Sequence, residues 1–203
     1  VHIEATRSNS PFRIAIIGLG SRSQELLLDC FKFNQNIQVV AACDDFAQES
    51  HLFFMQNLIR EKHPYVDTFK KSFSDVTFYN DTEQELQKLF SCHQDIDAVF
   101  ITSANSHHVR HLKAVQKYCS CKNVYMEKPL FKTLDEFVNF KWQGDSDVLI
   151  GLTLRYSTMA KIVATQLKAF KDQLGALQKV RAWENVKFCQ GLANFMMSWR
   201  RHI

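Results

Sequence analysis

The sequence lacks any long apolar run. No stretch of its 203 residues approaches the roughly 20 consecutive apolar residues that a membrane-spanning helix needs. It also lacks a basic block with interleaved aromatics, because the net charge of +4 comes from 25 basic and 21 acidic residues scattered along the chain. Residues 1–6 lack the basic-then-apolar layout of a signal peptide. We therefore expect a cytoplasmic protein with no nucleic-acid and no membrane partner.

The cysteine pattern of a zinc site or a dithiol redox motif is absent as well. Cys119 and Cys121 are separated by a single residue, which fits neither spacing. Most of the six cysteines fall inside expected helices and strands. We therefore expect reduced structural thiols, as in a cytosolic protein, and no metal.

What the sequence does contain is an ordinary globular composition, with 46% hydrophobic and 23% charged residues. Short apolar runs rich in β-formers alternate with segments of helical spacing over about 150 residues. This alternation predicts an α/β fold, a Rossmann-type doubly wound parallel sheet. The expected strands are 12–17, 37–43, 76–79, 97–102, 123–126 and 148–152.

The alternation of strand-like and helix-like segments stops after residue 155. A long amphipathic helix ends near Gly175, and residues 179–188 alternate like a half-exposed strand. We expect a dinucleotide-binding domain over residues 1–155 and, over 156–203, the start of an α+β second domain that serves substrate binding and oligomerisation.

A glycine-containing loop follows the first expected strand directly. Gly18 permits a tight turn, and Gly20 lets a pyrophosphate approach the backbone amides of Ser21 and Arg22 at the start of the next helix. Ser23 replaces the third glycine of the usual fingerprint, which serves close packing of helix on strand. A strand-to-helix turn with no ligand is the alternative interpretation.

Asp44 stands at the tip of the second expected strand. A carboxylate there accepts hydrogen bonds from the adenosine ribose and repels a 2′-phosphate, which favours NAD over NADP. The alternative is a helix cap, which suits Asp45 better. An acid at this position also suits an S-adenosylmethionine methyltransferase, so the loop and the acid alone leave the cofactor open.

Polar residues also end the fourth and fifth expected strands. Thr102 and Ser103 lie where the cofactor should pass, and His107 can approach the nicotinamide half or simply be a solvated residue at the helix end. Lys128 follows a buried strand, next to Glu127 and before a proline that restricts it to extended geometry. A solvated surface lysine is the alternative for Lys128.

These motifs together resemble the Gfo/Idh/MocA family of oxidoreductases, which includes glucose-fructose oxidoreductase and inositol dehydrogenases. The resemblance runs from Phe12 to about Arg200. Its matching segments are Ile17–Arg22, Cys43–Asp44, Asp97–Thr102 with a following histidine, Glu127–Pro129 and the arginine-containing Gly151–Tyr156.

The resemblance implies hydride transfer between NAD(P) and a sugar, polyol or related hydroxyl substrate. It implies that Lys128 polarises the reacting hydroxyl, that the Lys128–Pro129 bond is cis, that Glu127 contacts the cofactor, and that His107 and Arg155 contact the substrate. It also implies a homo-oligomer for the full-length protein.

The sequence departs from the family pattern at three places. Ser103 stands where proline is common, and Ser23 where glycine is common. The Asp-x-x-x-His element expected soon after Trp199 and Arg200, whose histidine accepts the proton, is missing. We therefore expect a chain truncated in its C-terminal domain, and the alternative function is a cofactor-binding but catalytically incomplete sensor or scaffold.

Overall fold

The computed structural model of the protein describes residues 10–152 and 157–175. The chain divides into two compact units, residues 1–153 and 154–203. Each unit is described by itself below.

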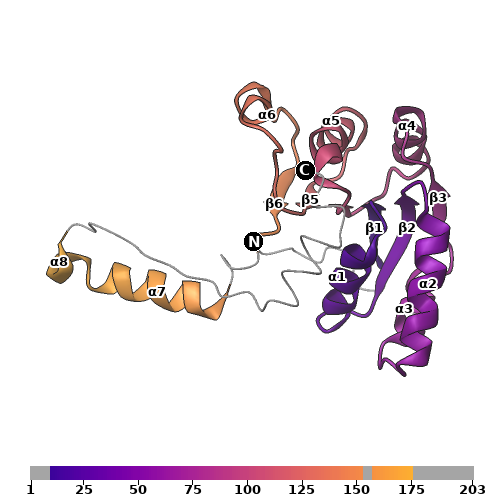
Figure 1. The fold of residues 1–203 in the computed structure, drawn as a ribbon, viewed down its shortest axis with the longest axis horizontal. Helices are drawn as coiled ribbons and strands as arrows, with labels where there is room; N and C mark the ends of the chain where they lie inside the picture. Colours follow the sequence, from indigo (N-terminus) through magenta and orange to yellow (C-terminus); the bar gives the residue numbers. More distant parts are fainter. Residues whose placement is uncertain (1–9, 153–156, 176–203) are drawn as a thin grey trace, which may run out of the picture. The chain divides into compact units, whose positions relative to one another are not determined.

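The first unit is built on a six-stranded sheet in the order β3-β2-β1-β4-β5-β6, with every neighbouring pair parallel (Figure 1). This order and direction confirm the predicted doubly wound α/β fold. The strands are β1 (Phe12–Ile17), β2 (Ile37–Cys43), β3 (Thr77–Tyr79), β4 (Ala98–Ile101), β5 (Asn123–Met126) and β6 (Asp147–Ile150).

Helices cover both faces of the sheet, and each face has its own apolar core (Figure 1). One core lies beneath α1 (Ser21–Phe31), α2 (Ala47–Arg60) and α3 (Val66–Ser72). The other lies beneath α4 (Glu83–Cys92) and α5 (His108–Tyr118). Strand β1 is buried on both faces, because Ile14 and Ile16 enter the first core while Ala15 and Ile17 enter the second.

Three local features of the structure are not evident from the sequence pattern. The segment 61–75, which is charged and aromatic without a clear period, contains α3, which buries Phe69 completely against α1 and the sheet. Asn105 and Ser106 do not cap α5, since a 3₁₀ turn (Asn105–His107) comes before it. On α2, Leu52 is exposed, because the sheet-facing side is instead the one that carries Ala47 and Leu58.

The remaining described helices are α6 (Leu134–Asn139) in the first unit, and α7 (Thr158–Ala169) and α8 (Lys171–Leu174) in the second. The Ser157 hydroxyl accepts a hydrogen bond from the Ala160 amide and caps α7. The expected strand at 179–188 lies outside the described residues. Within the described ranges, no helix combines the length and apolar character needed to cross a membrane.

Candidate functional site

The turn after β1 is fixed by backbone geometry that glycine alone adopts easily. Gly18 has φ +88°, and a Cβ there would collide with the backbone of Ser103 after β4. Its amide donates to the Cys43 carbonyl at 2.8 Å, and its carbonyl accepts from the Thr102 hydroxyl at 2.7 Å. The turn is therefore held between the carboxyl ends of β2 and β4.

The start of α1 is open in a way that suits an anion. Gly20 is the N-cap, no side chain caps the helix, and no acidic residue stands in its first turn. A Cβ on Gly20 would meet no atom of the described residues within 4 Å, so packing among those residues does not account for this glycine. The first backbone amides of α1 lack helical partners and point outward, which is the arrangement that binds a pyrophosphate.

Ser23 packs beneath the loop at the position where the usual fingerprint has its third glycine. It is fully buried, and its hydroxyl donates to the Gly20 carbonyl at 2.8 Å. The buried hydroxyl therefore has a hydrogen-bond acceptor within the first turn of α1, and the fold accommodates a serine at this position.

A buried carboxylate links the glycine turn to the end of β5. Glu127 is 7% exposed, and its Oε1 accepts from Arg22 Nε at 2.8 Å and from the Tyr125 hydroxyl at 2.7 Å. Burial raises the pKa of Glu127, but the hydrogen bonds from Tyr125 and Arg22 outweigh it and leave that pKa lowered. Glu127 is therefore an ionised anchor that joins the first turn of α1 to the Lys128 segment.

Lys128 lies exposed at this edge, directly after the anchor. Its amide donates to Glu127 Oε2 at 3.3 Å, and the Lys128–Pro129 bond is cis, as the resemblance implies. Ile101 and Met126 are paired in register, so Ser103 and Lys128 each stand two residues beyond a paired position of neighbouring strands. Within the described ranges no carboxylate forms an ion pair with the Lys128 amine.

Asp44 follows β2 at the same edge of the sheet. Its amide donates to the Tyr79 carbonyl at 3.0 Å, and its Oδ1 accepts from the Phe46 amide at 3.0 Å. The expectation that Asp45 caps α2 is wrong, because Asp45 Oδ1 accepts instead from the Asp81 amide at 3.0 Å and bridges to the loop after β3.

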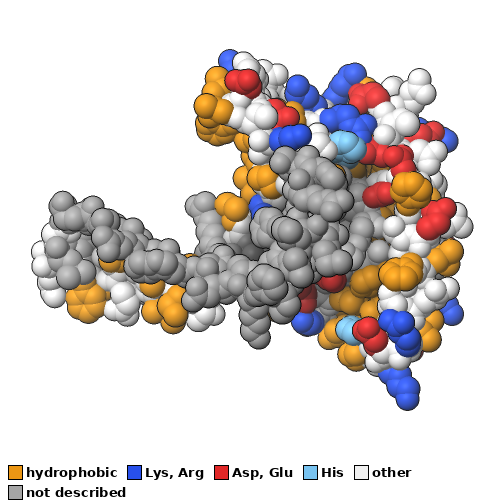
Figure 2. Space-filling view, viewed as in Figure 1, with side chains coloured by type: hydrophobic (Ala, Val, Ile, Leu, Met, Phe, Trp, Pro, Cys, Tyr) orange, Lys and Arg blue, Asp and Glu red, His pale blue; other side chains and the backbone are white. Residues whose placement is uncertain are grey.

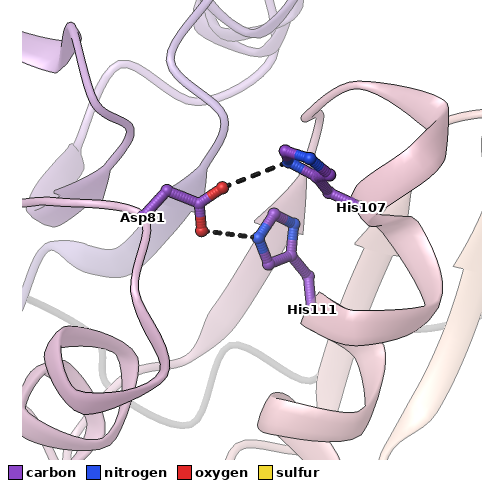
Figure 3. A group of neighbouring side chains, drawn as sticks. All are labelled: Asp81, His107 and His111. Atoms are coloured by element: carbon purple, nitrogen blue, oxygen red, sulfur yellow. Dashed lines mark hydrogen bonds and ion pairs between the residues drawn. The ribbon is translucent and has the colours of Figure 1, made fainter.

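A second network lies at the start of α5, around Asp81 (Figure 3). Asp81 Oδ1 is 2.8 Å from His111 Nε2, and Oδ2 is 3.3 Å from His107 Nδ1 and 2.6 Å from Arg110 Nη2. His111 is fully buried, whereas His107 is half-exposed. His107 is therefore paired with Asp81.

One carboxylate with two histidines could suggest a metal centre. The Arg110 guanidinium, however, sits on the same carboxylate and lies 2.9 Å from His111 Nε2. The positive charge of Arg110 lies beside both atoms that would bind a metal, the Asp81 oxygen and His111 Nε2, and it disfavours a cation there. Hydrogen bonds also already occupy the carboxylate. These contacts make the cluster a hydrogen-bonded, ion-paired network.

Sequence analysis missed the part played by His108. This side chain is fully buried, with Nδ1 2.6 Å from the Pro129 carbonyl and Nε2 2.9 Å from the Ser103 carbonyl. It fastens the loop after β4 to the loop after β5. The available signal was spacing, because His108 and His111 share a helical face with Leu112 and Val115 on the buried side of α5.

The structure thus gathers most of the predicted site residues at one edge of the sheet: Gly18, Gly20, Ser21, Arg22, Asp44, Thr102, Ser103, Glu127 and Lys128 all follow the carboxyl ends of β1, β2, β4 and β5. This edge includes the β1–β4 junction, where the chain order of the strands reverses and ligands of such sheets bind. His107 lies at the start of α5. Arg155 lies outside the described residues.

The fold and this edge define a dinucleotide-binding protein of the Rossmann class. Residues 12–141 match the model of the Gfo/Idh/MocA oxidoreductase family, which is described by an NAD-binding Rossmann fold. The chain belongs to this family. The match leaves no support for a methyltransferase. No curated protein sequence matches the chain.

Solved structures share the fold at low sequence identity. One is myo-inositol dehydrogenase from Lactobacillus casei in complex with NAD(H) and myo-inositol, with TM-score 0.53 and 18% identity over 79% of this chain and 42% of that one. Another is the WlbA dehydrogenase from Thermus thermophilus in complex with NAD and UDP-GlcNAcA, with TM-score 0.52 and 17% identity over 77% and 47%. A dehydrogenase from Chromobacterium violaceum aligns with TM-score 0.54 and 20% identity over 78% and 41%. The chain therefore spans less than half the length of each of these proteins.

Proposed function

We propose that this protein is an NAD-dependent oxidoreductase that transfers a hydride between the nicotinamide and a hydroxyl-bearing substrate such as a sugar or polyol. The observation that carries the proposal is the link from the open start of α1 through Arg22 and Glu127 to Lys128. That link connects a helix start whose open amides suit an anion with an exposed lysine on the same edge of the sheet, which supports the proposal.

The residues at this edge fit a dinucleotide. The open space at Gly20 and the uncapped start of α1 suit a pyrophosphate, and Asp44 can accept from ribose hydroxyls. The bound nicotinamide would supply the hydride acceptor or donor. Because the Asp44 carboxylate repels a 2′-phosphate, we propose NAD in preference to NADP.

Lys128 provides the polar chemistry in this proposal. Its ammonium group would donate a hydrogen bond to the substrate oxygen and stabilise the alkoxide that forms when the hydroxyl proton passes to water. That alkoxide becomes the carbonyl as the carbon gives up its hydride. Glu127 cannot take over that role, because Arg22 and Tyr125 already bind its carboxylate. Glu127 instead keeps the two loops together, and His107 and Arg155 remain proposed contacts for the substrate.

Two wider features belong to the same proposal. The similar dehydrogenases from Lactobacillus casei and Thermus thermophilus are complexes with myo-inositol and UDP-GlcNAcA, which supports a polyhydroxylated substrate. The five cysteines in the described part of the chain are free thiols, which supports a cytosolic location. We also propose that the full-length protein is a homo-oligomer, as the family resemblance implies.

The test is a titration of NADH and NADPH by fluorescence, followed by turnover on a panel of sugars and polyols. We expect tighter binding of NADH, and we expect Lys128→Ala to lower kcat by about 100-fold or more with little change in NADH affinity. Lys132→Ala is the matched control, because Lys132 is exposed a few residues further along the same loop.

Failure to bind either nucleotide would overturn the proposal. NADH binding without turnover on any substrate would instead favour the incomplete sensor or scaffold. Turnover in Lys128→Ala at the rate of the parent protein would show that Lys128 does not act on the substrate oxygen.

A further inference from the structure

Ser103, His111 and Asp81 form a hydrogen-bonded chain that ends at the cofactor edge. Ser103 Oγ is 2.7 Å from His111 Nδ1, and His111 Nε2 is 2.8 Å from Asp81 Oδ1 (Figure 3 shows the histidine–aspartate part). Ser103 is half-buried, and its backbone packs against Gly18, the first residue of the pyrophosphate turn. The chain therefore runs from a buried carboxylate to a hydroxyl beside that turn.

The direction of each hydrogen bond follows from the charge on Asp81. Burial raises the pKa of Asp81, but the bonds from His111 and Arg110 outweigh it and bring that pKa down to about 2. The ionised carboxylate accepts only, so His111 Nε2–H donates to Oδ1 and Arg110 donates to Oδ2 at 2.6 Å. The 2.9 Å distance between Arg110 Nη2 and His111 Nε2 is then a contact between two donors that bind different oxygens of one carboxylate.

His111 carries its single proton on Nε2. Burial is the largest influence and lowers the pKa of His111; Asp81 raises that pKa, whereas Arg110 and His107 lower it. The neutral ring therefore presents a lone pair at Nδ1, and the Ser103 hydroxyl must donate to it. With its hydrogen held by the ring, Ser103 Oγ offers only lone pairs to a ligand.

We propose that His111 and Asp81 are positioning residues that hold the Ser103 hydroxyl as a hydrogen-bond acceptor for a ribose hydroxyl of the bound dinucleotide. This inference rests on the proposed function of the same edge. Ser103 occupies the place where the family commonly has proline, so the contact would be particular to chains that carry this serine.

The arrangement makes cofactor affinity sensitive to acid. When His111 takes a second proton, Nδ1 becomes a donor, and Ser103 must turn its own hydrogen away from the ring. It then presents a donor to a ribose hydroxyl where it had presented an acceptor. Since the pKa of His111 is lowered, this change occurs below the ordinary histidine value of 6.5. Asp81, Arg110 and His107 are the charged and titratable groups that act on the ring.

The test is NADH affinity as a function of pH in the intact chain. We expect affinity in the parent protein to fall about tenfold as pH drops below the usual histidine range, because the hydrogen bond between Ser103 and the ribose hydroxyl must then reverse its direction, and tenfold is about the worth of one such bond. Ser103→Ala should bind about tenfold more weakly at neutral pH and lose the pH dependence. Ser103→Thr, which keeps the hydroxyl, should restore both.

His93→Gln is the control for other titrating histidines. Burial lowers the pKa of His93 as well, but His93 follows α4 on the approach to the start of β4, away from the carboxyl edge of the sheet. This variant should keep the pH profile of the parent protein. An unchanged affinity and profile in Ser103→Ala would overturn the inference while leaving the proposed function intact, and absence of NADH binding by the parent protein would overturn both.

A second readout needs no cofactor. Nitrogen-15 spectra of the histidine rings should show His111 protonated on Nε2 alone at neutral pH, with an Nδ1 shift that changes in Ser103→Ala. A proton on Nδ1 at neutral pH would overturn the proposal even if NADH binds.

Discussion

Two glycines in the turn after β1 lack a side chain for different reasons. At Gly18 the backbone has φ +88° and the neighbouring Ser103 leaves no room, so the requirement is internal to the fold. At Gly20 the backbone is extended and a Cβ would meet no described atom within 4 Å, so packing among the described residues does not require a glycine there, whereas the proposed pyrophosphate would. We therefore expect Gly18 to matter for stability and Gly20 for cofactor binding, although only one residue lies between them.

This contrast predicts that alanine substitutions at the two glycines affect different properties, stability in one case and NADH binding in the other. Gly18→Ala should lower the free energy of unfolding by about 2 kcal/mol or more, through the strained φ and the collision with Ser103. Gly20→Ala should leave that free energy nearly unchanged but weaken NADH binding by about tenfold or more. Urea denaturation and fluorescence titration of both variants measure this, and equal destabilisation by the two would contradict it.

Asp81 illustrates how one residue connects several elements. Its carboxylate is 11% exposed and holds His111 and Arg110 of α5 from the loop that follows β3. Such a buried, ionised carboxylate stabilises the fold only while it stays charged.

The lowered pKa of Asp81 predicts a defined pH dependence of stability. Because the pKa falls from 3.8 unfolded to about 2 folded, the stabilisation is complete above about 4 and is lost as pH falls toward 2. Asp81→Asn should therefore unfold with about 2 kcal/mol less free energy at neutral pH. The difference from the parent protein should shrink on acidification through that window, as followed by urea denaturation, and a constant difference would argue against the assignment.

At the scale of elements, helix α5 provides many of the buried hydrogen bonds that hold the loops of the site. Its buried face presents His108 to the carbonyls of Ser103 and Pro129, and His111 to Ser103 and Asp81. One helix thus contacts the loops after β3, β4 and β5. Figure 2 shows mixed acidic, basic and histidine side chains around this part of the surface, and hydrophobic side chains over α6, where Leu134, Phe137 and Val138 are exposed.

The two threonine-capped helices α4 and α6 differ in how much they matter to the core. Thr82 caps α4, which buries Leu86, Leu89 and Phe90, whereas Thr133 caps α6, which buries no residue. Thr82→Ala should lower the global free energy of unfolding by about 1 kcal/mol. Thr133→Ala is the matched control and should change it by much less, because α6 can open locally. Chemical denaturation compares them, and a larger effect at Thr133 would be inconsistent with this packing.

At the scale of the whole molecule, the first unit shields its thiols unequally. Cys43 and Cys121 are buried in the core beneath α4 and α5, whereas Cys92 at the end of α4 is exposed. Burial raises the pKa of Cys43 to about 12, which suppresses the reactive thiolate.

Thiol labelling should therefore report the folded state of this unit. We expect a thiol reagent to label Cys92 within the native protein, and Cys43 and Cys121 only at the rate of unfolding. Mass spectrometry of digested, labelled protein identifies each site, with Cys92→Ser as the control. Rapid native labelling of Cys43 would show that the core opens more readily than its packing implies.

Local chemistry in the sequence was enough for the fold class and much of the site. Alternating apolar runs and helical spacings specify strands and helices, and parallel connections bring strand ends to one edge, so Gly18, Asp44, Ser103 and Lys128 could be expected together. The functional roles assigned to these residues remain predictions.

Only the tertiary structure decided which side chains face one another across that edge. Nothing in the sequence pairs Arg22 with Glu127, 105 residues apart, or directs His108 and His111 onto Ser103. The same holds for the exposure of Leu52, whose spacing suits a core face. Periodicity is a local property, whereas hydrogen-bond direction, burial and the resulting pKa values depend on neighbours that only packing brings into contact.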